Sequence, residues 1–194
     1  PNLPYPKAFV RRIHGVYYDT KMNVLTPQEA VRILQERGSY IIKPAFGTMQ
    51  GQDVHKVTLQ GSADEKRKMV ELSFAGQSAD FIAQEVLSQH PDVAALNPTS
   101  LNCCRVTTIY LDGHFGYSTI IKFGRKGSDV DNWHSSFFGG VSSSGALLPK
   151  AYDYKLVPAT QTDLGLTFGG RQLPAFDEMI AMVEQAHKQY FPNC

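Results

Sequence analysis

The length, composition and charge of the chain exclude several classes of protein. Its 194 residues are 42% hydrophobic and carry a formal net charge of +1, from 19 basic and 18 acidic side chains. This content is ordinary for one globular domain with a sizeable core, and the near-zero charge supplies no field that would attract a polyanion, so nucleic acid is not an expected partner.

The sequence also lacks the features of export and of membrane insertion. No apolar run approaches the roughly 20 residues that a spanning helix needs, and the N-terminus lacks the basic-then-apolar order of a signal peptide. The three cysteines, Cys103, Cys104 and Cys194, are an odd number without metal-type spacing, which favours a reducing compartment. We therefore expect a soluble, cytoplasmic protein with no membrane span.

Capping signals in the first half of the chain predict two helices. Thr26 is an expected N-cap, and Glu29 completes a capping box three residues later. Ser62 and Glu65 repeat this arrangement for a second helix, which Gly76 is expected to end.

Apolar runs around these helices predict strands. The segment 40–44 is typical of a buried strand, and the glycine-containing segment 45–53 links it to a second strand near 54–59. A further short strand is expected over 81–87.

The second half begins with a predicted hairpin. Asp112 and Gly113 separate two β-rich runs within 105–123, as a tight turn would. The segment 142–172 is rich in turn formers and is expected to meander, and the segment 173–191 has helical spacing. Mixed strands and helices without regular βαβ alternation predict an α+β fold.

Lys43 is the first candidate for binding a ligand. It ends an apolar strand and precedes a loop that contains Gly47 and Gly51, so it could direct an ammonium group at phosphates while flexible backbone N–H groups close over them. The spacing is not that of a P-loop. The alternative is a strand-end lysine that reaches solvent beside an ordinary hairpin loop.

The polar pair Gln84 and Glu85 follows apolar residues of the strand predicted over 81–87. A strand that emerges from the core here could offer its backbone carbonyl and amide to the edge of an adenine. The alternative is that both residues are the polar phase of an edge strand.

Two arginines, Arg105 and Arg125, fall near the base of the predicted hairpin and could lie side by side. Adjacent arginines rarely pack without an anion between them. That anion could be a carboxylate of the protein or a phosphate of a ligand, and the sequence leaves both open.

Polar and small residues follow the hairpin. Asp129, Asp131 and Asn132 could be metal ligands, or they could form a polar turn whose side chains cap the local backbone. Gly139 and Gly140 could permit close approach of a ligand to the backbone, or could make a bend.

Taken together and in order, these segments resemble a known family. The chain resembles the sugar-transfer-associated ATP-grasp family, which is distantly related to glutamate-adding ATP-grasp ligases. The segments that carry the resemblance are "YIIKPAFGTMQGQDVHKV", "DFIAQEVLSQHPDVAALNPTSLNCCRVTTIYLDG", "IIKFGRKGSDVDN" and the glycine pair 139–140, with "RRIHGVYYD" before them and "LPAFDEMIAMVEQAH" after them.

The resemblance implies a single ATP-grasp core over 1–194 with an ATP site between two α+β lobes. The lid lobe would span approximately 38–86 and a partial catalytic lobe approximately 100–194. By the same resemblance, Lys43 is similar to the lysine that binds nucleotide phosphates, and the loop 45–52, with Gly47 and Gly51, is similar to a phosphate lid.

The resemblance also implies roles for the remaining candidates. The hinge that brackets adenine would consist of Gln84, Glu85 and Val86. Candidate catalytic residues that face phosphates and acceptor would be Arg105, Arg125 and Asn132, with Gly139 and Gly140 beside them.

The implied activity is ATP-dependent ligation. ATP phosphorylates a carboxylate, and an amine or similar nucleophile captures the acyl phosphate, with Mg²⁺ and basic side chains neutralising charge. The family is linked to cell-surface polysaccharide synthesis, so the acceptor would be an unknown small molecule or saccharide. Alternatives are a non-catalytic nucleotide-binding module and an ATP-grasp kinase.

The metal ligands of the family are not matched in this sequence. In the family, strands that follow the helix corresponding to 174–190 supply the ligands of Mg²⁺, and we expect these ligands beyond Cys194. We therefore expect the 194-residue chain alone to bind nucleotide weakly and to turn over little.

Overall fold

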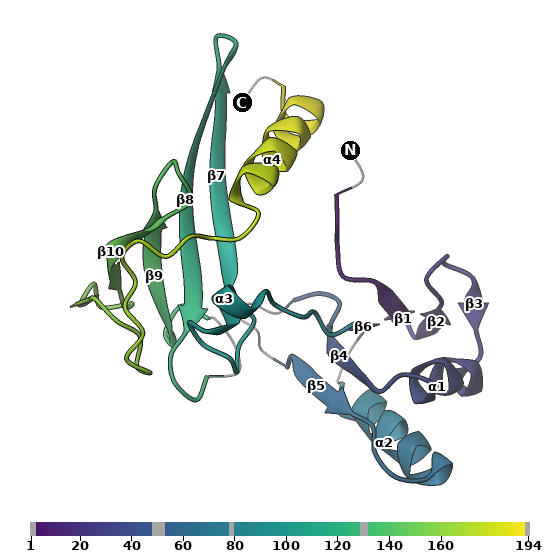
Figure 1. Ribbon diagram of the computed structural model, residues 1–194. Helices are drawn as coiled ribbons and strands as arrows, with labels where there is room; N and C mark the ends of the chain where they lie inside the picture. The colour runs from purple at the N-terminus through teal and green to yellow at the C-terminus, as the bar shows by residue number, and fades with distance from the viewer. Residues whose placement is uncertain (1–2, 48–52, 78–79, 129–131, 193–194) are drawn as a thin grey trace. The chain divides into compact units, whose positions relative to one another are not determined.

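The chain forms two compact units, which are described separately. The computed structural model describes residues 3–47, 53–77, 80–128 and 132–192 (Figure 1). The first unit runs from Pro4 to Leu87, and the second contains residues 88–192. The α+β class expected from the sequence is confirmed, because each unit combines an antiparallel sheet with helices.

The first unit is a six-stranded antiparallel sheet in the order β3-β2-β1-β6-β4-β5. Its strands are β1 (Ala8–Ile13), β2 (Val16–Tyr18), β3 (Val24–Leu25), β4 (Ser39–Pro44), β5 (His55–Thr58) and β6 (Phe81–Gln84). Its helices are α1 (Pro27–Gln35) and α2 (Ala63–Ala75).

Both predicted capping boxes are confirmed. The Glu29 carboxylate accepts the Thr26 N–H at 2.8 Å, and the Glu65 carboxylate accepts the Ser62 N–H at 2.7 Å. These hydrogen bonds hold the pKa of both carboxyl groups below the usual range. Helix α2 is capped by Gly76, as the sequence predicts.

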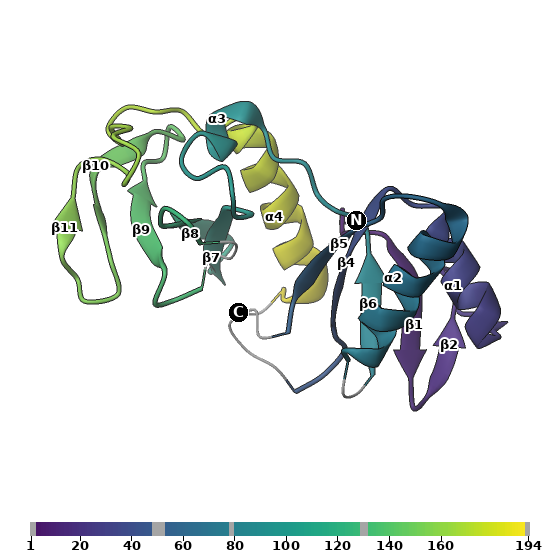
Figure 2. The ribbon, with the colours of Figure 1, turned by 90° about the horizontal axis from the view of Figure 1, so that it is seen from below.

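Helices α1 and α2 cover the same face of this sheet (Figure 2). Their apolar side chains pack against alternate residues of the strands, so one face of the sheet is core. The buried residues that make this core include Val10, Ala30, Leu34, Tyr40, Ile42, Val70, Phe74, Phe81 and Ala83.

Strand β6 differs from the prediction in length and position. The predicted strand over 81–87 ends at Gln84. Beyond it, the Glu85 N–H donates to the carbonyl of Lys7, which precedes β1, so the pairing with the β1 side of the sheet continues for one more residue. Strand β6 lies between β1 and β4, so the interpretation of Gln84 and Glu85 as part of an edge strand is wrong.

The second unit is a five-stranded antiparallel sheet in the order β11-β10-β9-β8-β7. Its strands are β7 (Cys103–Leu111), β8 (His114–Gly124), β9 (Ser136–Val141), β10 (Leu147–Tyr152) and β11 (Pro158–Ala159). Its helices are α3 (Pro91–Ala94) and α4 (Phe176–Tyr190).

The predicted hairpin is confirmed. Asp112 and Gly113 have φ of 50° and 79°, the left-handed conformations that a tight two-residue turn between twisted strands requires. Strands β7 and β8 then pair without interruption from the Leu111 and His114 pair to the Cys103 and Lys122 pair. The segment 142–172, which was expected only to meander, contains β10 and β11.

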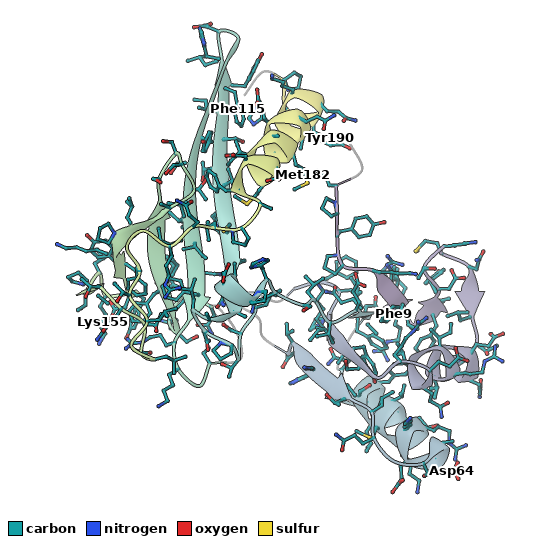
Figure 3. All side chains as sticks on the ribbon, viewed as in Figure 1. Phe9, Asp64, Phe115, Lys155, Met182 and Tyr190 are labelled. Carbon is teal, nitrogen blue, oxygen red and sulfur yellow. The ribbon has the colours of Figure 1, made fainter. Side chains whose placement is uncertain are left out.

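Helix α4 covers one face of this second sheet. The buried His187 ring bonds through Nδ1 to the Thr108 hydroxyl at 2.7 Å. Phe115, near the start of β8, lies beside α4 (Figure 3), with its ring centroid 6.1 Å from that of His187. No helix in the described parts of the chain is long and apolar enough to cross a membrane.

A buried polar network fixes the irregular segment before β7 to the end of β8. Asn97 Nδ2 donates to the Ser100 hydroxyl at 2.9 Å, and this hydroxyl donates to Asn102 Oδ1 at 3.0 Å. Asn102 Oδ1 also accepts the Gly124 N–H at 3.3 Å. All three polar residues are buried, so each of these bonds replaces one to water.

Gly124→Ala is expected to destabilise the second unit. A Cβ at Gly124 would lie 2.6 Å from both Asn97 Nδ2 and the Ser100 hydroxyl, so the network would have to break. Unpaired buried polar groups cost about 1–3 kcal/mol, and the free energy of unfolding should fall by that amount. Urea unfolding followed by the fluorescence of Trp133, the single tryptophan, measures it.

The matched control is Gly38→Ala, because a Cβ there meets nothing within 4 Å. It should leave the Trp133 transition unchanged. An unchanged midpoint for Gly124→Ala would contradict the importance of the network.

Candidate functional site

Lys43 and Gln84 lie on the face of the first sheet that α1 and α2 leave uncovered. In the β4 and β6 pairing, Ile41 is opposite Gln84 and Lys43 is opposite Ile82. Paired residues of antiparallel strands share a face, and the intervening Ile42 points into the core. Lys43, Ile41, Ile82 and Gln84 therefore form one half-buried group of two polar and two apolar side chains.

The backbone beyond β6 offers a pair of polar groups beside this face. The Glu85 N–H donates to the Lys7 carbonyl at 2.9 Å, and the Glu85 carboxylate accepts the Lys7 N–H at 2.7 Å. Within the described residues, the Glu85 carbonyl and the Val86 N–H make no hydrogen bond. An acceptor and a donor on consecutive residues are thus available to a ligand.

The segment after Lys43 first continues the pairing with the residues before β6. The Ala45 N–H donates to the Asp80 carbonyl at 2.8 Å, and Gly47 has φ of +77°, a conformation that favours glycine. Gly51, the second glycine of the predicted phosphate-binding loop, lies outside the described residues.

The anion beside Arg125 is a carboxylate of the protein. Arg125 donates through Nε and Nη2 to both oxygens of Asp163, at 3.0 and 2.8 Å, and its guanidinium lies 4.6 Å from the Phe137 ring centroid. Asp153 is 3.9 Å from Nη1. The bidentate bond raises the pKa of Arg125 and lowers that of Asp163. These residues border a polar pocket of about 710 Å³.

Arg105 and Arg125 are not brought side by side. Arg105 is opposite Ile120, so its side chain lies on the face away from the buried Ile121. Arg125 lies over Phe137, which belongs to the core face of the same sheet. The two guanidinium groups therefore belong to opposite faces.

Lys122 lies on the same face of the second sheet as Arg105, a grouping that the sequence alone does not indicate. Lys122 lies on β8 between Cys103 and Phe138, on the outer face of the sheet. The Trp133 ring is 4.7 Å from that of Phe138. The alternation of side chains along 114–124 already assigns Lys122 to one face of its strand. Its neighbours on β7 and β9 are known only once the register of these strands is known.

The remaining candidates have local structural roles. Asn132 Oδ1 accepts the Ser135 N–H at 2.9 Å and the Ser135 hydroxyl at 2.7 Å, which is the local capping that a polar turn predicts. Asp129 and Asp131 lie outside the described residues.

The glycine pair lies within β9 and makes no bend. A Cβ at Gly139 would lie 3.3 Å from Ile121 Cγ2, and a Cβ at Gly140 would lie 2.8 Å from Leu148 Cδ1. The space that Gly140 leaves is thus filled by Leu148.

Within the described ranges, carboxylates that could hold Mg²⁺ are not gathered in one place. Among the residues that the structure describes, no three or more His, Cys, Asp or Glu side chains form a group that could hold a metal ion. Asp163 is hydrogen-bonded to Arg125, and Asp153 accepts the Lys155 and Val157 N–H groups at 2.9 Å each. These residues do not fit the metal site that the family resemblance implies.

Comparison with known proteins adds no family assignment. No protein-family model matches the chain, and no curated protein or solved structure was found to match it.

Asp163→Asn is expected to lower the free energy of unfolding of the second unit by about 1 kcal/mol at neutral pH, the value for a partly exposed ion pair of good geometry. The folded-state pKa of Asp163 is lowered, so its stabilisation is present above about pH 4 and disappears as pH falls through the folded-state pKa. The difference between wild type and variant should therefore shrink at about pH 3.

Urea unfolding at both pH values, again followed by Trp133, measures this difference. The control is Asp64→Asn, whose partner Arg67 and whose own side chain are 52% and 83% exposed. It should change little at either pH. A deficit in Asp163→Asn that is equal at both pH values would show that the charge is not its cause.

Proposed function

We propose that this chain binds ATP through the uncovered sheet face of its first unit, as part of an ATP-dependent ligase of the ATP-grasp kind. The observation that carries the proposal is the grouping of Lys43 and Gln84 around Ile41 and Ile82 on that face. Such a surface combines a cation for phosphates with apolar area for a base, which is what a nucleotide requires.

The backbone beside this face supports adenine as the base. The Glu85 carbonyl would accept the exocyclic amino group of adenine, and the Val86 N–H would donate to the adjacent ring nitrogen. Guanine presents an acceptor and a donor in the reverse order, so it would leave both protein groups unpaired. The N–H groups that follow Lys43, beginning near Gly47, would extend the phosphate contacts.

The proposed reaction is the activation of a carboxylate. The γ-phosphoryl group passes to a carboxylate oxygen with release of ADP, and an amine then attacks the acyl carbon with release of phosphate. Lys43 would orient the phosphates and neutralise part of their charge. The catalytic roles of Arg105, Arg125 and Asn132, and a link to cell-surface polysaccharide synthesis, remain predictions from the resemblance.

A nucleotide-binding module without catalysis is the second candidate. It is favoured because two of the predicted catalytic side chains already have partners in the protein. Arg125 is bound to Asp163, and Asn132 caps its own turn. Mg²⁺ is implied by the resemblance without matching ligands among the described residues, so the binding proposal depends on Lys43 and the backbone groups.

Lys43→Met is expected to weaken ATP binding by about tenfold or more, because a charge-assisted hydrogen bond to phosphate contributes about 1.5–3 kcal/mol. Adenosine, which has no phosphate, should bind wild type and variant equally. GTP should bind wild type about tenfold or more weakly than ATP. Calorimetric titration of each ligand measures these affinities.

Lys68→Met is the control, because Lys68 is an exposed lysine of α2, which packs on the opposite face of the sheet. It should bind ATP as the wild type does. Equal losses in both lysine variants would contradict a specific phosphate contact, and equal binding of GTP and ATP would contradict the adenine assignment.

The reaction class is tested by the requirement for two substrates. A ligase should release ADP from ATP only when both a carboxylate and an amine are supplied, and the amount of ADP should equal that of the new amide. Coupled detection of ADP together with mass spectrometry of the products measures both. Tight ATP binding with no ADP under any pair of substrates would favour the non-catalytic module.

A further inference from the structure

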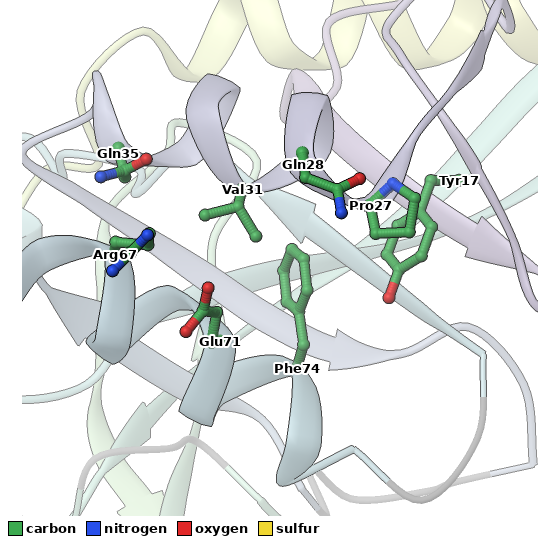
Figure 4. Close-up of a pocket in the computed structure, with 8 residues that line it drawn as sticks. All are labelled: Tyr17, Pro27, Gln28, Val31, Gln35, Arg67, Glu71 and Phe74. Atoms are coloured by element: carbon green, nitrogen blue, oxygen red, sulfur yellow. The ribbon is translucent and has the colours of Figure 1, made fainter. Parts of the chain in front are cut away.

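A second pocket lies in the first unit, between helices α1 and α2 and away from the proposed ATP-binding face. Its volume is about 420 Å³, within the range of small-molecule sites. Figure 4 shows the eight residues that line it, Tyr17, Pro27, Gln28, Val31, Gln35, Arg67, Glu71 and Phe74.

The floor of the pocket is apolar and firmly held. Val31 and Phe74 are 8% and 7% exposed and belong to the core beneath the helices. The Tyr17 ring packs against that of Phe74, with centroids 5.6 Å apart. This surface can receive a hydrocarbon or aromatic group without rearrangement of the core.

Two side chains of opposite charge, Arg67 and Glu71, lie on the rim of the pocket. Arg67 and Glu71 are one turn apart on α2, so they lie on the same side of the helix. Among the described residues, Arg67 forms an ion pair with Asp64 at 3.4 Å and none with Glu71. Figure 4 shows Arg67 beside Gln35 at one end of the pocket, and Glu71 between Arg67 and Phe74.

The two helices are fixed relative to each other at the end of the pocket that holds Arg67. Gln35 Nε2, on the last turn of α1, donates to the Ala63 carbonyl at the start of α2 at 3.0 Å. The capping boxes at Thr26 and Ser62 fix the first turn of each helix. Arg67 and Glu71 therefore project from a helix whose position relative to α1 is fixed before a ligand binds.

We propose that this pocket binds a small zwitterion with an apolar side chain, of the class of the apolar α-amino acids. Its carboxylate would lie at Arg67, its ammonium at Glu71, and its side chain over Phe74 and Val31. Charge complementarity selects this class, because an anion alone would face Glu71 and a cation alone would face Arg67.

L-Phenylalanine is the probe, and hydrocinnamic acid and phenethylamine are the analogues that lack its ammonium and its carboxylate. Saturation-transfer NMR on the full chain should show phenylalanine bound. Each analogue should bind about two- to fivefold more weakly, the effect expected of losing one partly exposed charge pair. Equal binding of all three, or no saturation transfer to phenylalanine, would overturn the proposal.

Two variants test whether phenylalanine binds in this pocket. Glu71→Gln and Arg67→Gln should each weaken phenylalanine by about two- to fivefold, and Glu71→Gln should leave hydrocinnamic acid no weaker. Glu184→Gln removes a half-buried helical charge in the second unit, where Glu184 is paired with Lys188 at 2.7 Å, and should change nothing. Unchanged phenylalanine binding in Glu71→Gln and Arg67→Gln would refute the assignment, whatever the chain does with ATP.

Discussion

The register between β4 and β6 is the constraint on which the first unit depends. Strand residues alternate between faces, so a slip of one residue would bring Lys43 toward the core and expose Ile42. The cost of burying an unpaired ammonium group makes that slip unfavourable, and α1 and α2 hold the register by covering only one face. In the first unit, the described strand side chains on the other face are then not packed against α1 and α2.

The second unit uses its polar residues differently. Asn97 and Asn102 are buried and hold an irregular segment against the end of β8, while Arg125 holds Asp163 of a loop 38 residues away in sequence. Such polar residues near the ends of strands could suggest a binding site. Here, however, they stabilise segments that lack regular structure. A ligand that bound Arg125 would have to displace the Asp163 carboxylate, which is hydrogen-bonded to the guanidinium through both of its oxygens.

Features fixed by local chemistry were predictable from the sequence. The capping boxes at Thr26 and Ser62 and the turn at Asp112 involve residues within a few positions of each other, so the pattern alone specifies them. The partner of Arg125 was not predictable, because many carboxylates could have reached it and only the fold brings Asp163 there. The central position of β6 escaped prediction for the same reason, since strand order is a non-local property.

The candidate site was predictable in its residue types and not in its grouping. The sequence indicated Lys43 and Gln84 separately, each with a plausible structural alternative, and their common face follows only from the pairing with Ile82 and Ile41. Nucleotide binding and catalysis also need different groups. Nucleotide affinity can come from one sheet face and its adjacent backbone, whereas acyl transfer also needs cations that are not already neutralised. Because the Arg125 guanidinium is already paired with Asp163, the proposed ATP binding is compatible with a chain that does not turn ATP over.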